Sequence, residues 1–188
     1  MIILGAKYIH PNCEADLICC NMYKEGKVSG CISNDMDFLP SGTGILIRNY
    51  NLSDKVDEYN LDTILKDSLL TYDKFVDLCI LCGCDYTTKI HRLGFVTAYK
   101  NLLKYNNIEE IIENLCIKEK KFKVPENFDY ETARKLLKNS NNDCLKYKII
   151  ETKKNKINEE DRKFIMNNTK YTELQLNNRL NIIFDNIK

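Results

Sequence analysis

Five acidic residues in the first half of this 188-residue chain stand at positions where their carboxylates can meet. The pair Asp35 and Asp37 follows a predicted buried strand. Glu14 and Asp16 begin the helix before that strand, and Asp85 follows the end of a later helix. At an effective dielectric constant of about 20, two carboxylates about 4 Å apart repel by about 4 kcal/mol. Converging carboxylates must therefore hold cations or take up protons, and oxygen ligands without clustered histidines favour Mg²⁺ or Mn²⁺ over zinc.

The same spacing also allows an ordinary explanation. An aspartate near the start of a helix most often caps the helix or stays solvated. Asp35 and Asp37 share one face if the chain there is extended, because side chains alternate along a strand. Glu14 and Asp16 would diverge by roughly 200° in a regular helix, so they share a site only if the first turn is irregular. Spacing alone leaves the metal site and the solvated alternative both open.

Short apolar segments before residue 50 predict strands that alternate with a helix. Residues 2–4 and 8–9 read as a short buried strand, and Asn12 is expected to cap a helix from Glu14 to Tyr23. Two further strands are expected at Val28–Ser33 and Gly44–Arg48. This order predicts an α/β fold with parallel strand pairing.

Beyond residue 50 the apolar pattern becomes helical. The segment Thr71–Leu81 carries apolar residues on one face and ends at Gly83, a suitable residue for a helix terminus. Residues 119–127 are charged, contain Pro125 and are expected to form a loop. No internal repeat and no clear boundary between domains is visible. Further helices are expected at Val96–Tyr105, Ile108–Cys116, Asp129–Leu137 and Glu159–Met166, with helical spacing again at Thr172–Ile187.

Composition excludes several classes of protein. Hydrophobic residues make up 44% and charged residues 29% of the chain, as in globular proteins and unlike disordered or fibrous ones. No apolar run approaches the roughly 20 residues of a membrane span, and the opening apolar run is too short for a signal peptide. The nine cysteines are odd in number, which predicts a reduced, intracellular protein.

The net charge of +1 hides an uneven distribution. The first 100 residues carry 13 acidic and 10 basic side chains, whereas the remaining 88 carry 14 and 18. An acidic first part and a basic second part suit a metal site beside a surface that binds a polyanion.

Three segments resemble the flap endonuclease family. Residues 8–16 and 24–28 (YIHPNCEAD and KEGKV) are similar to the family's proline turn, its E-A-E-A helix and its K-x-G-K-V strand. Residues 33–39 (SNDMDFL) are similar to its E-D-M-D-x-L metal segment. Residues 75–86 (FVDLCILCGCDY) match its F-V-D-L-C-I-L-x-G-C-D-Y block almost letter for letter. Two later landmarks, at 124–127 and 158–161, also resemble the family, so the likeness is collinear over nearly the whole chain.

The resemblance implies a structure-specific 5′ nuclease of DNA replication and repair, which hydrolyses a phosphodiester near a junction of single-stranded and duplex DNA. It implies a PIN-like α/β core (here residues 1–82) followed by a helix-two-turn-helix and C-terminal helices (83–188). Two Mg²⁺ ions, or Mn²⁺, are implied, one generating hydroxide and one stabilising the leaving oxygen. By position, the implied catalytic metal ligands are Glu14 and Asp16 near the first ion and Asp35, Asp37 and Asp85 near the second.

The resemblance covers the C-terminal half of the family's nuclease core. Family members begin with Met-Gly, contribute two more aspartates from early strands, and carry a helical arch with catalytic basic residues. These 188 residues contain no counterpart, so we expect a fragment, one half of a split enzyme completed by a separate polypeptide, or a chain that has lost catalysis. The alternative function is a non-catalytic DNA-binding or interaction module that retains the scaffold. The location expected is the nucleus or, for a viral protein, the host nucleus or cytoplasm.

The predicted DNA-binding turn departs from the family pattern G-I-G-P-K-R-A, whose carbonyls hold K⁺ and whose basic residues meet phosphates. Here Arg92 takes the place of the first glycine, and Gly94 keeps the last one. Val96 and Thr97 replace the basic pair. We expect the backbone amides at the start of this helix to face a phosphate, with K⁺ possible at the turn. The expected DNA-binding residues are Lys89, Arg92, Gly94, Val96, Thr97 and Lys100.

Three other features are weighed against ordinary roles. Cys79, Cys82 and Cys84 lie on one helix and its end and are interpreted as buried structural cysteines rather than a thiolate metal site. The lysines between 118 and 123 form a basic loop that is either solvated or in contact with DNA. The run Gln175–Phe184 does not fit the sliding-clamp motif Q-x-x-[IL]-x-x-F-F, so clamp binding is not supported.

Overall fold

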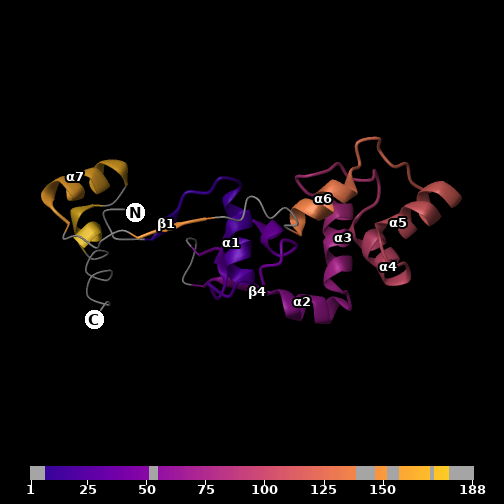
Figure 1. The fold of residues 1–188 in the computed structure, drawn as a ribbon, viewed down its shortest axis with the longest axis horizontal. Coiled ribbons are helices and arrows are strands. Elements are labelled where there is room, and N and C mark those ends of the chain that lie inside the picture. The colour runs from indigo at the N-terminus through magenta and orange to yellow at the C-terminus, as the bar shows by residue number, and fades with distance from the viewer. Residues whose placement is uncertain (1–6, 51–54, 139–146, 152–156, 170–171, 178–188) are drawn as a thin grey trace. The chain divides into compact units, whose positions relative to one another are not determined.

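The structure, a computed structural model, describes residues 7–50, 55–138, 147–151, 157–169 and 172–177 (Figure 1). The chain forms two compact units. The larger comprises residues 11–146, and the smaller combines residues 1–10 with 147–188. Within the described residues no helix is both long and apolar enough to cross a membrane.

A three-stranded sheet lies at the start of the larger unit. Strand β2 (Cys31–Ile32) runs parallel to β3 (Ile45–Arg48), and β4 (Asp57–Asn60) pairs antiparallel with β3, in the order β2-β3-β4. The predicted α/β class with parallel pairing is therefore confirmed. Strand β4, which is too polar to show a strand pattern, and the helix α2 (Leu61–Ser68) that follows it were not predicted.

Helix α1 (Ala15–Lys24) follows Glu14 and precedes β2 in the chain, and it buries Ile18 and Cys20. It begins after Glu14, so the prediction that Asn12 caps it is wrong. The helix packs close to the turn before β3. A side chain at Gly44 would place its Cβ 2.1 Å from the Tyr23 hydroxyl oxygen, so any larger residue here would have to displace the Tyr23 ring. The core beneath contains Cys20, Cys31, Phe38, Leu39, Leu46 and Leu61.

Helix α3 (Tyr72–Cys82) runs from this first core into a second, larger one. Its N-cap is Thr71, whose hydroxyl accepts a hydrogen bond from the Lys74 amide at 3.3 Å. It ends at Gly83, whose φ of +111° is a conformation that other residues rarely adopt. The predicted helix is present, but its most buried residues are Val76, Ile80 and Leu81, which have no exposed surface. Of the apolar face that the sequence predicted, Leu78 is buried, and the other members, Phe75, Cys79 and Cys82, are half-buried.

Four helical segments pack around the second core. They are α4 (Phe95–Lys104), α5 (Ile108–Ile111), the π-helix η3 (Ile112–Lys118) that continues α5, and α6 (Tyr130–Leu137). The loop expected at 119–127 lies between η3 and α6. The apolar spacing of the sequence therefore located these elements, although it gave no sign of the change from α- to π-helix after Ile111.

A buried ion pair joins three elements of the second core. Asp77 on α3 is 3% exposed, and its carboxylate accepts two hydrogen bonds from Arg134 on α6, at 2.8 and 3.0 Å. It also accepts the Ile108 amide at 3.2 Å. The pKa of Asp77 is raised by burial, although Arg134 opposes this, whereas the same guanidinium lowers the pKa of the more exposed Glu109.

The smaller unit holds the chain ends that the structure describes. Strand β1 (Tyr8–Ile9) pairs antiparallel with β5 (Ile149–Ile150), and Lys7 forms an ion pair with Glu151 at 2.8 Å. The strand predicted at 8–9 is present but only half-buried, so the prediction of a buried strand is wrong there; residues 2–4 lie outside the described residues. Helix α7 (Glu159–Asn168) begins with a capping box between Asn158 and Asp161. The helical spacing expected from residue 172 is confirmed at 173–177, and residues 178–187 lie outside the described residues.

We predict that Asp77→Ala lowers the free energy of unfolding by about 3–5 kcal/mol, because it leaves the Arg134 charge and the Ile108 amide without their buried partner. Urea unfolding at pH 7 measures this. The matched control is Asp73→Ala, which removes a largely exposed carboxylate paired with Lys138 and is expected to cost less than about 1 kcal/mol. Equal losses for the two variants would contradict the assigned role of Asp77.

Candidate metal centre

Glu14 is the N-cap of α1 rather than part of the helix. Its backbone (φ −57°, ψ 129°) is not helical, and its side chain makes no capping hydrogen bond. The divergence of roughly 200° expected between Glu14 and Asp16 in a regular helix therefore does not apply. The irregular start that a shared site required is present.

Asp35 and Asp37 lie at a short 3₁₀-helix, η2 (Met36–Phe38), and not in an extended segment as predicted. Asp35 is the N-cap, and its Oδ1 accepts a hydrogen bond from the Asp37 amide at 2.9 Å. The Asp35 amide in turn donates to the Ser33 hydroxyl at 3.1 Å. The expectation of an extended chain failed because an aspartate followed by a turn satisfies the backbone amides locally. Both carboxylates nevertheless line the same cavity.

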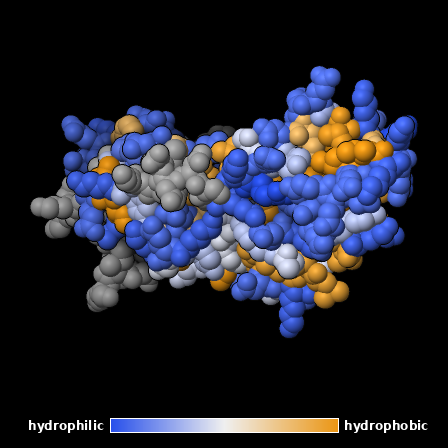
Figure 2. All heavy atoms as spheres, turned by 45° about the vertical axis from the view of Figure 1, so that its right-hand side comes forward, coloured by the Kyte–Doolittle hydropathy of each residue, from blue (hydrophilic) through white to orange (hydrophobic). Residues whose placement is uncertain are grey.

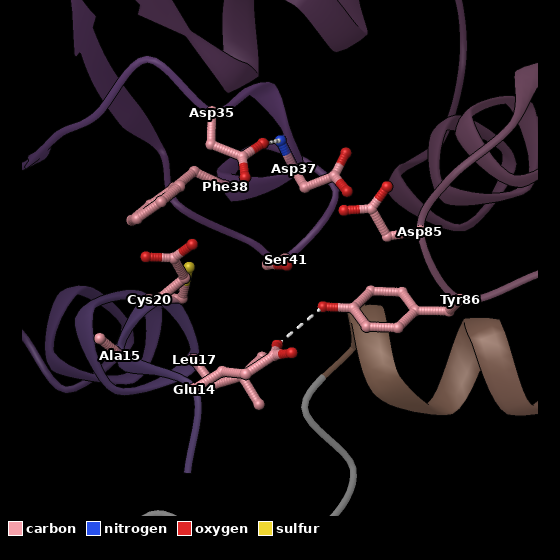
Figure 3. A pocket seen from close by; sticks show the side chains of 11 residues that line it. Glu14, Ala15, Leu17, Cys20, Asp35, Asp37, Phe38, Ser41, Asp85 and Tyr86 are labelled. Carbon is pink, nitrogen blue, oxygen red and sulfur yellow. Dashed lines mark hydrogen bonds between the residues drawn. The ribbon is translucent and has the colours of Figure 1, made fainter. Parts of the chain in front are cut away.

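Asp85 comes from the segment that follows α3. The chain leaves the helix at Gly83, and an isolated antiparallel bridge between Cys84 and Thr87 holds the next turn. This turn brings Asp85 and Tyr86 to the cavity, where they lie on the side opposite to Ala15 and Cys20 of α1 (Figure 3).

All five carboxylates line one cavity of about 390 Å³ (Figure 3). The side chains of Asp37 and Asp85 point toward one another across it, and Glu14 faces Tyr86, whose hydroxyl donates to Glu14 Oε2 at 3.1 Å. Three segments far apart in sequence thus supply the acidic wall. The remaining lining residues are Ala15, Leu17, Cys20, Phe38, Ser41 and Tyr86.

The carboxylates of the cavity disturb one another's ionisation. The pKa of Asp37 is raised, first by partial burial and then by the neighbouring charges of Asp35 and Asp85. The pKa of Asp16 is raised in the same way, by burial and then by Asp35 and Glu14. Negative charge at this site is therefore costly, and a bound cation would relieve the cost.

The donor set of the cavity fits a hard divalent cation. The polar groups that line it are carboxylates, the Ser41 and Tyr86 hydroxyls and one thiol, and neither described histidine is among them. Burial raises the pKa of the Cys20 thiol to about 12, so the thiol stays protonated and is a poor ligand. Among the described residues, no three His, Cys, Asp or Glu side chains are close enough to hold one ion between them. The carboxylates line the cavity without forming a closed cage.

The sequence matches the XPG I-region family over residues 5–85. It is 42% identical over 140 residues to flap endonuclease 1 of Aedes aegypti, covering 72% of this chain and 36% of that protein. Flap endonuclease 1 of Entamoeba histolytica is 35% identical over 176 residues, covering 91% and 46% of the two chains. The chain belongs to the flap endonuclease family. It spans between about a third and just under half of the length of these two relatives, and it matches the C-terminal half of the family's nuclease core.

Three solved structures share the fold. Flap endonuclease-1 from Methanococcus jannaschii has a TM-score of 0.70 at 20% identity, covering 97% of this chain and 54% of that one. The catalytic core of Rad2 in complex with DNA substrate has a TM-score of 0.56 at 25% identity, covering 73% and 45%. The junction-resolving enzyme GEN1 in complex with product DNA and Mg²⁺ has a TM-score of 0.51 at 19% identity, covering 66% and 36%. These likenesses confirm the predicted fold class.

The residues expected to bind DNA lie outside the cavity, in the segment between α3 and α4 and in the first two turns of α4. Gly94 is the N-cap of α4, and Val96 and Thr97 fall in its first turn. Arg92, which replaces a glycine of the flap endonuclease pattern, has a φ of +65° and so keeps the left-handed backbone that glycine favours. The complete set of expected residues is Lys89, Arg92, Gly94, Val96, Thr97 and Lys100, and all but the half-buried Thr97 are exposed.

Apolar side chains reach the surface among the hydrophilic ones in several places (Figure 2). Phe95 and Val96, at the start of α4, are 60% and 61% exposed. Because Val96 stands where the flap endonuclease pattern has a basic residue, this turn presents apolar surface beside the cations of Lys89 and Arg92.

Sequence reasoning missed Tyr86 and Cys20 as lining residues of the cavity. The tyrosine ends the G-C-D-Y block of the family, a signal that was available, whereas nothing in the helical pattern separates Cys20 from an ordinary core residue. The cysteines at 79, 82 and 84 are half-buried rather than buried. Burial raises the pKa of all three thiols, that of Cys79 to about 12, which agrees with a structural role.

We predict that Asp37→Asn raises the stability of the metal-free protein at pH 7 by about 0.5 kcal/mol, a small gain because solvent screens a partly exposed charge. The pKa of Asp37 is higher in the fold than in the unfolded chain, so its charge destabilises the fold above that pKa. As the pH falls through the folded pKa toward the lower pKa of the unfolded chain, protonation removes this cost, and the gain from the substitution shrinks. Thermal melts at pH 7 and pH 4 measure both effects. Glu58→Gln, on the exposed strand β4, is the control. A loss of stability in Asp37→Asn would contradict repulsion at this site.

Proposed function

We propose that this chain supplies the carboxylate site and the DNA-binding turn of a structure-specific DNA endonuclease, which hydrolyses a phosphodiester in branched or flapped DNA. One observation carries the proposal. Five carboxylates from three distant segments line a single cavity, in a chain that belongs to the flap endonuclease family. Carboxylates gathered in this way must hold cations or take up protons, and divalent cations held here would assist the hydrolysis of DNA.

Glu14, Asp16, Asp35, Asp37 and Asp85 are the residues that would hold the cations. Their oxygens suit Mg²⁺ or Mn²⁺, and the DNA complex of GEN1, a protein with this fold, contains Mg²⁺. Two such ions, when bound, would lower the pKa of the attacking water and stabilise the leaving oxygen. The protein's own part is to hold the carboxylates in place: Asp35 is fixed by its cap bond to the Asp37 amide, and Glu14 by Tyr86.

Two observations support DNA as the proposed partner: the turn before α4, and the chain's membership of the flap endonuclease family. The side chain of Gly94 cannot cap the helix, so the first backbone amides of α4 are available to a phosphate oxygen. Lys89, Arg92 and Lys100 are exposed around this turn and would neutralise phosphate charge. A K⁺ ion at the turn remains part of the proposal, and GEN1 has been solved with potassium. A DNA substrate would place the protein in the nucleus, or in the host nucleus or cytoplasm if it is viral.

The first prediction from this proposal concerns cleavage. The purified chain is expected to cut a labelled 5′-flap DNA in the presence of Mg²⁺ or Mn²⁺, and Asp35→Ala/Asp37→Ala is expected to lose at least about 100-fold in rate, because the ligands of one ion are removed. Gel analysis of the products measures both. Glu58→Gln, whose carboxylate lies outside the cavity, should cut as fast as the wild type.

The outcomes separate the alternatives. If the wild type does not cut but binds Mn²⁺ and DNA, the chain requires a second polypeptide that supplies the rest of the family's core. In that case, adding such a polypeptide should restore cutting. If neither metal nor DNA binds, the endonuclease proposal is refuted for this chain, and a scaffold that serves only protein interactions is the remaining function.

A second prediction concerns DNA binding. Replacing Lys89 and Lys100 by glutamine should weaken binding to duplex DNA and lower the slope of log K against log salt by about 2, since about one counterion is released for each phosphate contact. Fluorescence anisotropy over a range of salt concentrations measures the slope. Lys66→Gln, which replaces an exposed lysine of α2 that is not among the expected DNA-binding residues, should leave the slope unchanged.

Arg92 allows a matched pair of variants. Arg92→Gln and Arg92→Gly remove the same charge, but only glycine relieves the left-handed backbone at this position. Both are expected to weaken DNA binding by the same factor. If Arg92→Gly retains wild-type affinity while Arg92→Gln does not, the turn acts through its shape, and a phosphate contact by the Arg92 side chain is refuted.

A further inference from the structure

Glu14 needs a partner to fix its direction. It lies outside α1, its backbone is not helical, and its side chain makes no capping bond. It is also exposed, so neighbouring atoms do not confine its three side-chain torsions. A glutamate in this state samples many rotamers, and ordering it for a ligand costs conformational entropy.

Tyr86 supplies that partner. Its hydroxyl donates to Glu14 Oε2 at 3.1 Å across the cavity, between residues that are 72 positions apart (Figure 3). Within the described residues, this is the only hydrogen bond that the Glu14 carboxylate accepts. The bond occupies one carboxylate oxygen and leaves Oε1 free to bind a cation.

Tyr86 itself stands on a rigid support. It is half-buried, and its ring packs against the second core. The bridge between Cys84 and Thr87 closes the turn that carries it. The hydroxyls of Thr87 and Thr88 fasten the same turn to Asn127, at 3.4 and 3.1 Å. A donor held from both sides can impose its direction on a mobile carboxylate.

We propose that Tyr86 is a positioning residue, which orients Glu14 toward the divalent cation and thereby sets the affinity of the metal site. This inference rests on the proposed function, since it assumes that Glu14 is a metal ligand. Partners that orient metal ligands in this way commonly affect metal affinity by about 10- to 100-fold.

The test is a titration of the full chain with Mn²⁺, in which electron paramagnetic resonance measures the concentration of free Mn²⁺. Tyr86→Phe removes only the hydroxyl and is expected to weaken Mn²⁺ binding about tenfold. Tyr99→Phe is the matched control, because the Tyr99 hydroxyl donates to the Ser68 carbonyl at 2.9 Å and does not line the cavity. It should bind Mn²⁺ like the wild type. Circular dichroism melts of both variants verify that each is folded during the titration.

A double-mutant cycle shows whether Tyr86 acts through Glu14. In a Glu14→Ala background there is no carboxylate to orient, so Tyr86→Phe should cause no further loss of Mn²⁺ affinity. If instead the two substitutions weaken Mn²⁺ binding independently, so that their factors multiply in the double variant, Tyr86 affects the site by another route and the positioning role is overturned. A purely structural role would lower the melting temperature in both backgrounds without this dependence.

The same titrations distinguish failure of the inference from failure of the proposed function. If wild-type binding is lost in Asp35→Asn/Asp37→Asn but unchanged in Tyr86→Phe, the metal site holds and only the role of Tyr86 is overturned. If the wild type binds no Mn²⁺, or binds it equally well without Asp35 and Asp37, the metal site itself is refuted and the role of Tyr86 with it.

Discussion

Repulsion between carboxylates is the constraint on which this structure depends. Partial burial, and after it the charges of Asp35 and Asp85, raise the pKa of Asp37, so the fold must hold the three carboxylates together against their mutual repulsion. The restraint comes from packing on both sides of the cavity. Phe38, directly after Asp37, is buried in the first core, and α3, which leads to Asp85, is anchored in the second. The cavity is therefore as stable as the two cores that α3 connects.

Helix α3 packs against both cores and so fixes them relative to each other. At its start, Phe75 packs against the first core, and the Tyr72 hydroxyl donates to the Pro40 carbonyl at 2.7 Å. Farther along, Asp77 ties the helix to Arg134 and to the start of α5. The segment after Gly83 then places Asp85 at the cavity and continues into the DNA-binding turn before α4. One rigid helix thus sets the distance between the proposed chemical site and the proposed DNA contact.

The sequence predicted most of the helices, although not α2, because their apolar residues recur at helical spacing, as in α3. It placed all five carboxylates at one site through collinear motifs. It did not predict the local backbone that makes the site possible. The non-helical Glu14 and the 3₁₀-turn at Asp35 arise from cap and turn hydrogen bonds, which single aspartates and glutamates form or omit according to tertiary contacts. Strand β4 escaped prediction for a related reason, since a polar edge strand is defined by its partner and not by its own pattern.

The turn before α4 shows how shape and chemistry can separate. Ile90 and Leu93 are almost fully buried, and the Leu93 amide donates to the Ile90 carbonyl at 3.2 Å, so packing imposes the turn from both sides. Arg92 between them adopts a left-handed backbone that costs a non-glycine residue about 1 kcal/mol. Burial of Ile90 and Leu93 in the core offsets that cost. The turn therefore keeps the path that the family's glycine allows, while its positive charge moves from the first turn of the helix onto the turn itself.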